Sequence, residues 1–321
     1  MAMSVSVVLP TRDRPEALGR AVRSILDQPL RPLELIVVDN GTVGLAPELG
    51  DEARRAGVEY CCLRYEPPST TATRNLGLER ARGDIVLLFD DDQIMPGGFL
   101  QRLVALYEQD AAGVIDGIGG LCRQDPRGLG GRLWSVASCL AGECCWRPRV
   151  QAARYVRLPA PLGRQLSLPR WISGGAISLR REAAAAERFD ETMTGYAYSE
   201  DREFCFRVGR RRRLFLAADL QIIHDNAQSR SGDSAACGRR YVRNSLHVAA
   251  TAMDRGAGTW LLVMHDFIGT MLLHALWGAA LGKRWNLGFA RGMAAEMCSR
   301  AAAAVRDMWG GDSDPARGRP T

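Results

Sequence analysis

The sequence almost lacks lysine, since Lys283 is the only lysine among its 42 basic residues. So strong a preference for arginine indicates a coding bias more than a surface selected for nucleic acid. The arginines are scattered apart from the run Arg210 to Arg213, and no aromatic-rich nucleic-acid motif accompanies them. The net charge of +6 therefore does not predict a nucleic-acid partner, and we expect none.

The sequence also lacks cysteines at metal-binding or redox spacing. Its nine cysteines include the adjacent pairs Cys61–Cys62 and Cys144–Cys145 but no CxxC. Adjacent cysteines rarely build a disulfide framework, and no zinc-like spacing is present. The first residues show no basic segment followed by an apolar run, so we expect no secretory signal. These features predict reduced thiols and a cytoplasmic protein.

Four apolar runs alternate with helical patterns in the first ninety residues. The runs are Val5 to Leu9, Leu33 to Val38, Val58 to Tyr65 and Asp84 to Phe89. Because each run is apolar almost throughout, the pattern predicts a mostly parallel sheet covered by helices on both faces, an α/β fold. A chain of 321 residues with 46% hydrophobic content suffices for one large domain with an appendage.

The rest of the chain divides by composition. We expect an irregular insert at residues 128–170 with one short helix near Arg132 to Ala141, then a strand over Trp171 to Leu179. From about Ala235 to Met308 the chain reads as helical, and its last dozen residues as a disordered tail. The predicted units are residues 1–226, 227–309 and 310–321.

Polar residues follow three of the predicted strands. They are Pro10-Thr11, Asp39 and the triplet Asp90 to Asp92. Because parallel sheets bind ligands at the carboxyl ends of their strands, we expect these residues to meet at one edge. Three adjacent carboxylates repel one another, and a divalent cation is the usual remedy. The alternative is a solvated acidic turn.

Three later features also suggest a site. The pair Gly174-Gly175 interrupts a strand pattern and indicates either close approach of backbone to a ligand or a bulge. Ser199 is expected to cap a helix whose first turn holds Glu200 and Asp201, where the helix dipole favours negative charge. His224 follows a strand, as a structural residue or as a ligand.

A stretch of about 22 mostly apolar residues runs from Trp260 to Leu281. A spanning helix with Asp266 near its middle would be costly, so we expect a helix on a membrane surface or in a core. Trp260 and Trp277 near its ends, followed by Lys283 and Arg284, favour the membrane interface. The alternative is a helix that covers the protein's own apolar face or a dimer partner, so the oligomeric state stays open.

Five stretches occur in a specific order: VSVVLPTRDRPEALGRAVRSIL, ELIVVDNG, TRNLGLERARGDIVLLFDDD, SEDREFCFRV and IIHDN. On these stretches the chain resembles the family-2 type of glycosyltransferases with a glycosyltransferase-A fold, over about Val5 to Asn226. The segment Arg239 to Asn244 also looks like the tail region of bacterial polysaccharide members. Arg12 stands where an Asn is common, and the insert matches nothing, which leaves the acceptor open.

The resemblance implies a role for each matching position. Nucleotide binding is implied for Pro10, Thr11, Arg12, Asp39, Arg74, Asp90 and Asp91, with Asp39 facing the base and Asp91 near the ribose. Asp92 of the DxD-type motif and His224 would bind the metal. Asp201 would be the catalytic base of the ED motif, while Gly174, Gly175 and Glu200 would line the sugar and acceptor site.

The activity implied is an inverting, metal-dependent transfer of a hexose from a nucleotide-diphosphate sugar. The acceptor would be a saccharide or a lipid-linked molecule, and the enzyme would be cytoplasmic or peripheral at the inner face of the cell membrane. Asp oxygens suit Mg²⁺ or Mn²⁺, and one imidazole shifts the preference toward Mn²⁺. A nucleotidyltransferase would need a glycine-rich loop after the first strand, where Thr11 to Pro15 has no glycine. A non-catalytic nucleotide-binding subunit would show a broken acid set, yet Asp92, Asp201 and His224 are all present.

Overall fold

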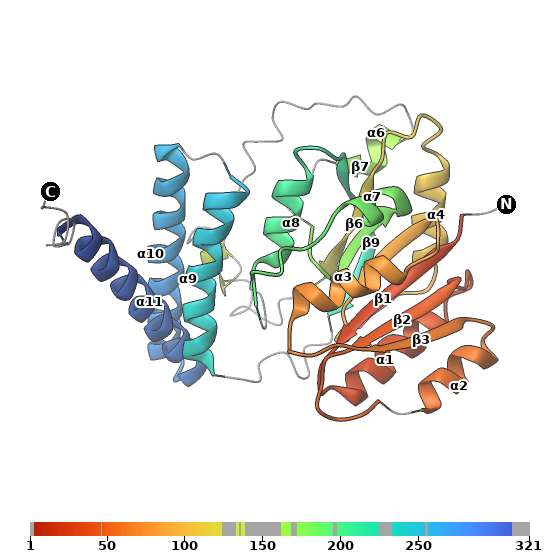
Figure 1. The fold of residues 1–321 in the computed structure, drawn as a ribbon, viewed down its shortest axis with the longest axis horizontal. Helices are drawn as coiled ribbons and strands as arrows, with labels where there is room; N and C mark the ends of the chain where they lie inside the picture. Colours follow the sequence, from red (N-terminus) through yellow and green to blue (C-terminus); the bar gives the residue numbers. More distant parts are fainter. Residues whose placement is uncertain are drawn as a thin grey trace, which may run out of the picture.

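A computed structural model of the protein shows a sheet domain and a layer of long helices side by side (Figure 1). It describes residues 3–45, 47–123, 133–134, 136–138, 162–167, 172–194, 198–224, 233–253 and 256–309. Within these residues the strands form one nine-stranded sheet. Most of the predicted insert and the whole predicted tail lie outside the described residues, although residues 133–134 and 136–138 are helical, as predicted for that part of the insert.

The first half of the sheet is parallel, in the order β3-β2-β1-β4. Its elements are β1 (Val5–Thr11), α1 (Pro15–Leu26), β2 (Glu34–Asp39), α2 (Glu48–Arg55), β3 (Glu59–Arg64), α3 (Thr70–Arg80) and β4 (Ile85–Phe89). The alternation of four strands with helices is therefore confirmed. Strands β1, β2 and β4 are apolar almost throughout because both of their faces are covered.

Alternate side chains of these strands enter two separate cores. On one face Val7, Leu35 and Leu87 pack with side chains of α1, α2 and α4 (Phe99–Glu108). On the other face Val8 and Ile36 pack with side chains of α3, α7 (Arg181–Ala186) and α8 (Glu200–Val208). Helices therefore cover both faces, as the sequence predicts.

The second half of the sheet mixes directions. It contains β5 (Gln93–Ile94), β6 (Gly117–Arg123), β7 (Leu166–Ser167), which follows the short helix α6 (Leu162–Gln165), β8 (Ala176–Arg180) and β9 (Leu214–His224). Strand β8 runs antiparallel between β4 and β6, whereas β6 and β9 are parallel to each other. Strands β5 and β7 are antiparallel to β9. Strand β9 is the longest of these, and His224 is its last residue.

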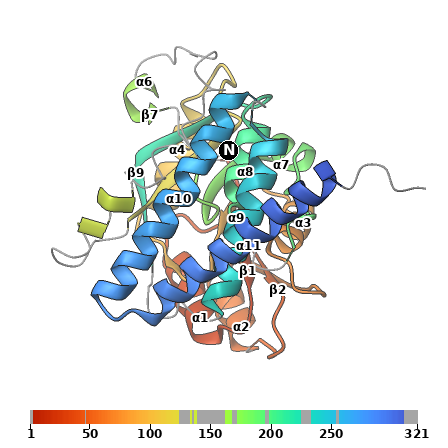
Figure 2. The same ribbon diagram turned by 90° about the vertical axis from the view of Figure 1, so that its left-hand side faces the viewer.

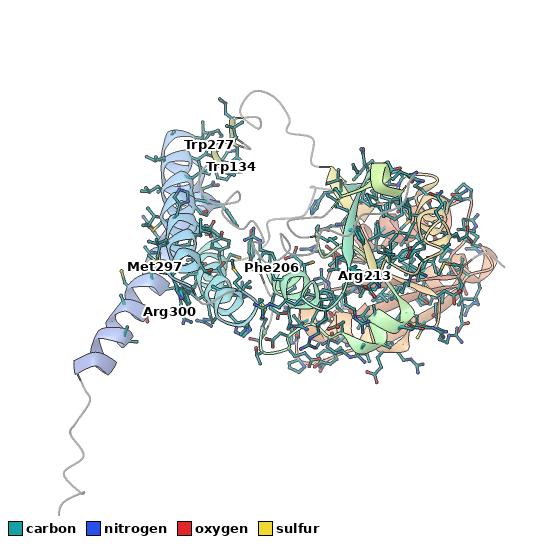
Figure 3. The ribbon with its side chains drawn as sticks, turned by 90° about the horizontal axis from the view of Figure 1, so that it is seen from above. Trp134, Phe206, Arg213, Trp277, Met297 and Arg300 are labelled. Atoms are coloured by element: carbon teal, nitrogen blue, oxygen red, sulfur yellow. The ribbon has the colours of Figure 1, made fainter. Side chains whose placement is uncertain are left out.

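Three helices build the C-terminal layer: α9 (Ser234–Thr251), α10 (Ala257–Ala280) and α11 (Arg284–Trp309). They share a core that includes Val248, Phe267 and Met293, so the predicted helical region is confirmed. Phe206 of α8 joins the same core and connects the layer to the sheet domain (Figure 3). Among the described residues α10 is long and apolar enough to cross a membrane by length and composition.

Candidate active site

The carboxyl ends of β1, β2 and β4 bring the first predicted polar residues to one edge of the sheet. Thr11 and Asp39 are partners in the register of β1 and β2. The Thr11 hydroxyl donates to Asp91 Oδ2 at 2.7 Å, across 80 positions of sequence. Asp90 follows β4 directly, so the acidic triplet stands at the same edge. The arrangement expected from strand ends in a parallel sheet is thus present.

Arg14 supplies a positive charge to the acidic triplet, a contact that the sequence did not reveal. Its Nη1 lies 3.3 Å from Asp91 Oδ1 and 3.0 Å from Asp92 Oδ2. Burial nevertheless raises the pKa of Asp91 to about 6, against the lowering effects of the Thr11 hydroxyl and Arg14. Burial and neighbouring Asp90 also raise the pKa of Asp92, while His224 and Arg14 lower it. These carboxylates are therefore crowded and only partly neutralised.

Asp92 and His224 form the candidate metal centre. Strand β5 pairs with β9 so that Gln93 stands opposite His224, and His224 Nε2 lies 3.7 Å from Asp92 Oδ1. His224 Nδ1 and Gln93 Oε1 are buried without a hydrogen-bond partner among the described residues. The same residues contain no cluster of three or more His, Cys, Asp or Glu side chains suited to a metal. A carboxylate and an imidazole fit an ion that takes its other ligands from phosphate and water.

Asp39 is held by its neighbours at the end of β2. Its Oδ2 accepts from Arg64 Nη1 at 2.6 Å and its Oδ1 from the Gly41 amide at 2.8 Å. Asp13 binds the next turn, because its Oδ1 accepts from the Thr42 amide at 2.6 Å. Asp13 has a φ of 53°, the left-handed region that Asp tolerates better than most residues. Two other residues predicted to bind the nucleotide lie near this turn. Pro10 is half-buried in β1, and Arg12 is exposed beside Asp13.

Arg74 joins the acidic triplet to the first turn of α8. Its Nη2 lies 3.0 Å from Asp90 Oδ1 and its Nη1 lies 2.6 Å from Glu200 Oε1. Burial lowers the pKa of Arg74, but the charges of Asp90 and Glu200 outweigh it and raise the pKa. Burial raises the pKa of Glu200 to about 7 against the effect of Arg74. The buried guanidinium of Arg74 thus contacts both Asp90, which was predicted to bind the nucleotide, and Glu200, which was predicted to line the sugar and acceptor site.

Gly174 and Gly175 form a turn before β8 rather than an interruption inside it, so that part of the strand prediction is wrong. A Cβ at Gly174 would lie 2.7 Å from Arg74 Nη1, and one at Gly175 would overlap the side chains of Gln93 and Asp90. The two glycines therefore let the backbone approach the site's own polar side chains. This close approach, and not a bulge, explains the pair.

Asp201 lies in the first turn of α8, behind Gly174. Its Oδ2 accepts from the Gly174 amide at 3.3 Å and its Oδ1 from the Arg202 amide at 2.8 Å. Burial raises the pKa of Asp201, and Arg202 and Arg74 counteract this effect in part. Ser199 has a φ of 74° and makes no capping hydrogen bond, so the predicted side-chain cap is wrong. A capping side chain needs extended backbone at that position.

Arg202 connects this turn to the helical layer. Its guanidinium is hydrogen-bonded to Tyr241 of α9, and the Tyr241 hydroxyl donates to Asp266 Oδ2 at 2.6 Å. Asp266 is fully buried on α10, where Thr270 also donates to it at 3.3 Å. The carboxylate that would be costly in a membrane span is thus satisfied inside the protein.

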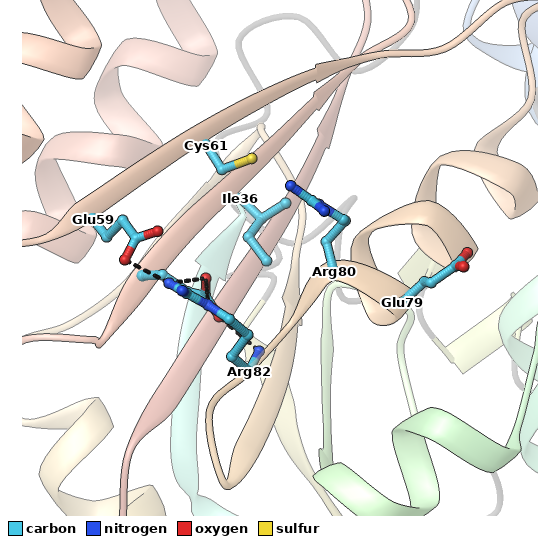
Figure 4. Close-up of a pocket in the computed structure, with 7 residues that line it drawn as sticks. Ile36, Glu59, Cys61, Glu79, Arg80 and Arg82 are labelled. Atoms are coloured by element: carbon cyan, nitrogen blue, oxygen red, sulfur yellow. Dashed lines mark hydrogen bonds and ion pairs between the residues drawn. The ribbon is translucent and has the colours of Figure 1, made fainter.

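A pocket of about 360 Å³ lies at the opposite end of the strands (Figure 4). Arg82 bridges Glu34 and Glu59 there, at 3.1 Å and 2.5 Å. Glu34 and Glu59 begin β2 and β3, so this cluster lies far along the strands from Asp39. We assign the pocket no part in the candidate active site.

Solved structures share this fold. The mannosyltransferase PcManGT from Pyrobaculum calidifontis, in complex with GDP-Man and Mn²⁺, aligns with a TM-score of 0.51 at 16% identity, over 97% of this chain and 89% of that one. TarS from S. aureus, in complex with UDP-GlcNAc, aligns with a TM-score of 0.53 at 13% identity, over 88% and 76%. The fold is that of the glycosyltransferase-A class, as predicted.

The sequence comparisons match part of the chain to one family of glycosyltransferases. Residues 6–138 match the model of glycosyl transferase family 2. The glucosyl-dolichyl phosphate glucuronosyltransferase of Haloferax volcanii is 30% identical over 36% of this chain and 37% of its own length. The GalNAc(5)-diNAcBac-PP-undecaprenol beta-1,3-glucosyltransferase of Campylobacter jejuni is 30% identical over 35% and 37%. Residues 6–138 are therefore similar to family-2 glycosyltransferases, and the match spans well under half the length of these relatives.

Proposed function

We propose that the protein transfers a sugar from a nucleotide-diphosphate sugar to an acceptor hydroxyl, with inversion and with a divalent metal. The observation that supports the proposal is the double ion pair of Arg74, which contacts both Asp90 of the acidic triplet and Glu200 of the first turn of α8. A donor-binding acid set and a base on a separate element are what direct displacement requires. The family-2 domain at residues 6–138 supports the same reaction class.

The nucleotide would bind along the ends of β1, β2 and β4. Asp39, immobilised by Arg64 and Gly41, offers fixed carboxylate oxygens to the base. Thr11 and Asp91, already hydrogen-bonded to each other, would hold the ribose region. Arg74 presents a buried positive charge close to the position proposed for the diphosphate.

Asp92 and His224 would hold Mn²⁺ or Mg²⁺ together with diphosphate oxygens. The ion would offset the negative charge that develops on the leaving diphosphate. The unpartnered His224 Nδ1 and the close approach of His224 to Asp92 support this donor set. The structural neighbour PcManGT carries Mn²⁺ with GDP-Man, which supports the choice of a divalent ion.

Asp201 would act as general base. Its carboxylate takes the proton of the acceptor hydroxyl while that oxygen bonds to the anomeric carbon and the bond to the diphosphate breaks. Because the attack comes opposite the leaving group, one displacement inverts the anomeric centre. The amides of Gly174 and Arg202 donate to the two oxygens of the Asp201 carboxylate, so this side chain is held in one position.

The acceptor we propose is a saccharide or a lipid-linked molecule, used in polysaccharide or glycolipid synthesis. Two relatives that share the N-terminal domain are named for dolichyl phosphate and undecaprenol substrates. With such acceptors the enzyme would be cytoplasmic or peripheral at the inner face of the cell membrane.

A screen of nucleotide sugars for hydrolysis, with and without Mn²⁺, tests the proposal. We expect one donor to be hydrolysed with metal and none with chelator. Once an acceptor is found, NMR of the product gives the anomeric configuration. Retention of configuration would overturn direct displacement, and hydrolysis unaffected by chelator would overturn the metal dependence.

A further inference from the structure

One side of α10 carries a row of exposed apolar side chains, with the exposed His265 among them. Its members, called here the apolar stripe, are Trp260, Leu261, Met264, Ile268, Leu272 and Leu276. From Leu261 onward the spacing is three or four residues, so these side chains share one side of the helix along its length. Leu261 is 72% exposed and Leu276 is 69% exposed. Isolated exposed leucines are ordinary, but a continuous row marks an interaction surface.

The opposite side of α10 is fixed to the protein by polar contacts. Asp266 accepts from Tyr241 of α9, which is also hydrogen-bonded to Arg202 of α8. Trp277 packs edge-on against Trp134 of the insert at 5.1 Å, so it does not belong to the apolar stripe (Figure 3). With one side tied to α8 and α9, lipid cannot surround α10. The helix can only lie on a membrane, not cross it.

The charges around the apolar stripe indicate the kind of surface it fits. The one acidic residue of α10 is the buried Asp266. Lys283 and Arg284, both exposed, stand at the turn between α10 and α11, and Arg291 is exposed on α11. Figure 1 shows α10 and α11 together at the end of the molecule away from the sheet, and Figure 2 views them from that end. Apolar side chains bordered by basic residues match an anionic bilayer, whose headgroups attract Lys and Arg.

We propose that the apolar stripe of α10 docks on an anionic lipid bilayer, with Lys283 and Arg284 at the headgroups. Trp260, at the start of the stripe, suits the interfacial depth that Trp prefers. The inference does not depend on the donor chemistry proposed above, because it concerns lipid binding alone. A second copy of the chain on the same stripe is the competing occupant.

Flotation of the full chain with vesicles tests the proposal. Vesicles of phosphatidylglycerol and phosphatidylcholine are compared with vesicles of phosphatidylcholine alone, at low and high salt. We expect flotation with the anionic vesicles and at least tenfold weaker binding for the variant Leu261→Glu/Leu272→Glu. The matched control Leu33→Glu/Leu121→Glu places the same charges at exposed leucines of the sheet domain and should bind as the unchanged protein does.

The basic residues provide a second, independent arm. Lys283→Glu/Arg284→Glu should weaken binding to anionic vesicles by about 30-fold or more, since each basic residue at such a surface contributes roughly a fivefold factor. Thermal unfolding verifies that each variant is folded. If Leu261→Glu/Leu272→Glu does not fold, the single variant Leu276→Glu replaces it.

Two results would overturn the proposal. One is a full chain that stays unbound with anionic vesicles at low salt. The other is light scattering that shows a dimer which Leu261→Glu/Leu272→Glu converts to a monomer, because the stripe would then be a subunit interface. Donor hydrolysis measured in the same samples without lipid shows whether the proposed reaction fails separately.

Discussion

The parallel half of the sheet and the helical layer use apolar residues in opposite ways. In β4 each of the five residues is buried, and the polar residues begin only where the strand ends. In α10 the apolar residues lie on the buried and on the exposed side alike. Burial inside the fold therefore accounts for the composition of β4 but not for that of α10. The comparison separates the proposed chemistry, at the sheet edge, from the proposed lipid contact, on α10.

The largest effect should come from the base at the sheet edge. Asp201→Asn should lower turnover by roughly 10²–10⁴-fold, because the amide cannot take the acceptor proton. Donor affinity, measured by calorimetry, should stay unchanged, while kcat falls. The control Asp219→Asn removes an exposed acid of β9 and should leave kcat as it is. Normal turnover by Asp201→Asn would remove the base from this site and leave the sheet edge without its proposed chemistry.

The next effect sharpens the comparison at the junction of the two regions. Asp266→Asn should lower the free energy of unfolding by on the order of 3 kcal/mol, because Arg202 loses a charge partner inside the protein. Urea unfolding measures the change. The double variant Arg202→Met/Asp266→Asn removes both charges and should recover part of the loss, because Asp201 then keeps Arg74 alone of its two cations. An unaltered stability in Asp266→Asn would show that the layer is held by apolar packing alone.

A smaller effect concerns the metal. Asp92→Asn should weaken nucleoside-diphosphate binding in Mn²⁺ by at least roughly 10–100-fold. Metal affinity falls by that factor even when only a hydrogen-bond partner of a metal ligand is replaced. Binding in chelator should change little. Calorimetry with and without Mn²⁺ separates the two, and Asp51→Asn on the exposed face of α2 is the control. Equal losses with and without Mn²⁺ would indicate a direct contact with the nucleotide instead.

The smallest effect is the pH dependence of stability. The pKa of Glu200 is raised from 4.5 to about 7 in the folded protein, so between these values the folded chain holds a proton that the unfolded chain has released. Stability should therefore fall as pH rises through this window, by at most about 1.4 kcal/mol per pH unit for one proton. Glu200→Gln should reduce the slope. Urea unfolding at pH 5, 6 and 7 measures how the free energy of unfolding depends on pH. The same slope in Glu200→Gln would contradict the raised pKa of Glu200.

Much of the fold was predictable because burial imposes a local pattern. Val5 to Leu9 and Asp84 to Phe89 could be recognised as strands since a two-sided parallel sheet needs continuous apolar runs. The antiparallel course of β8 could not be predicted, because the run from Ala176 to Arg180 does not encode its partner or direction. The turn at Gly174 likewise depends on side chains of Arg74 and Asp90, which are distant in sequence.

The site was predictable where residues follow strands and unpredictable where long side chains reach across. Thr11, Asp39 and the acidic triplet meet at one edge because of the strand order alone. Arg14 was missed, since only the fold shows that its guanidinium reaches Asp91 and Asp92. Serine before an acid pair predicts a capped helix, but the left-handed backbone at Ser199 prevents that hydrogen bond.

The buried chain from Arg202 through Tyr241 to Asp266 bears on how the protein could be re-engineered. Arg202, the residue beside the proposed base, has its hydrogen-bond partner Tyr241 on α9 and the nearby carboxylate of Asp266 on α10, and an exchange of C-terminal segments would replace both helices. A chimaera with foreign helices would keep Arg202 and lose both of its partners there. The new helices must therefore carry Tyr and Asp at the positions of Tyr241 and Asp266, or Arg202 must be replaced at the same time. The helical layer is therefore not an interchangeable attachment module.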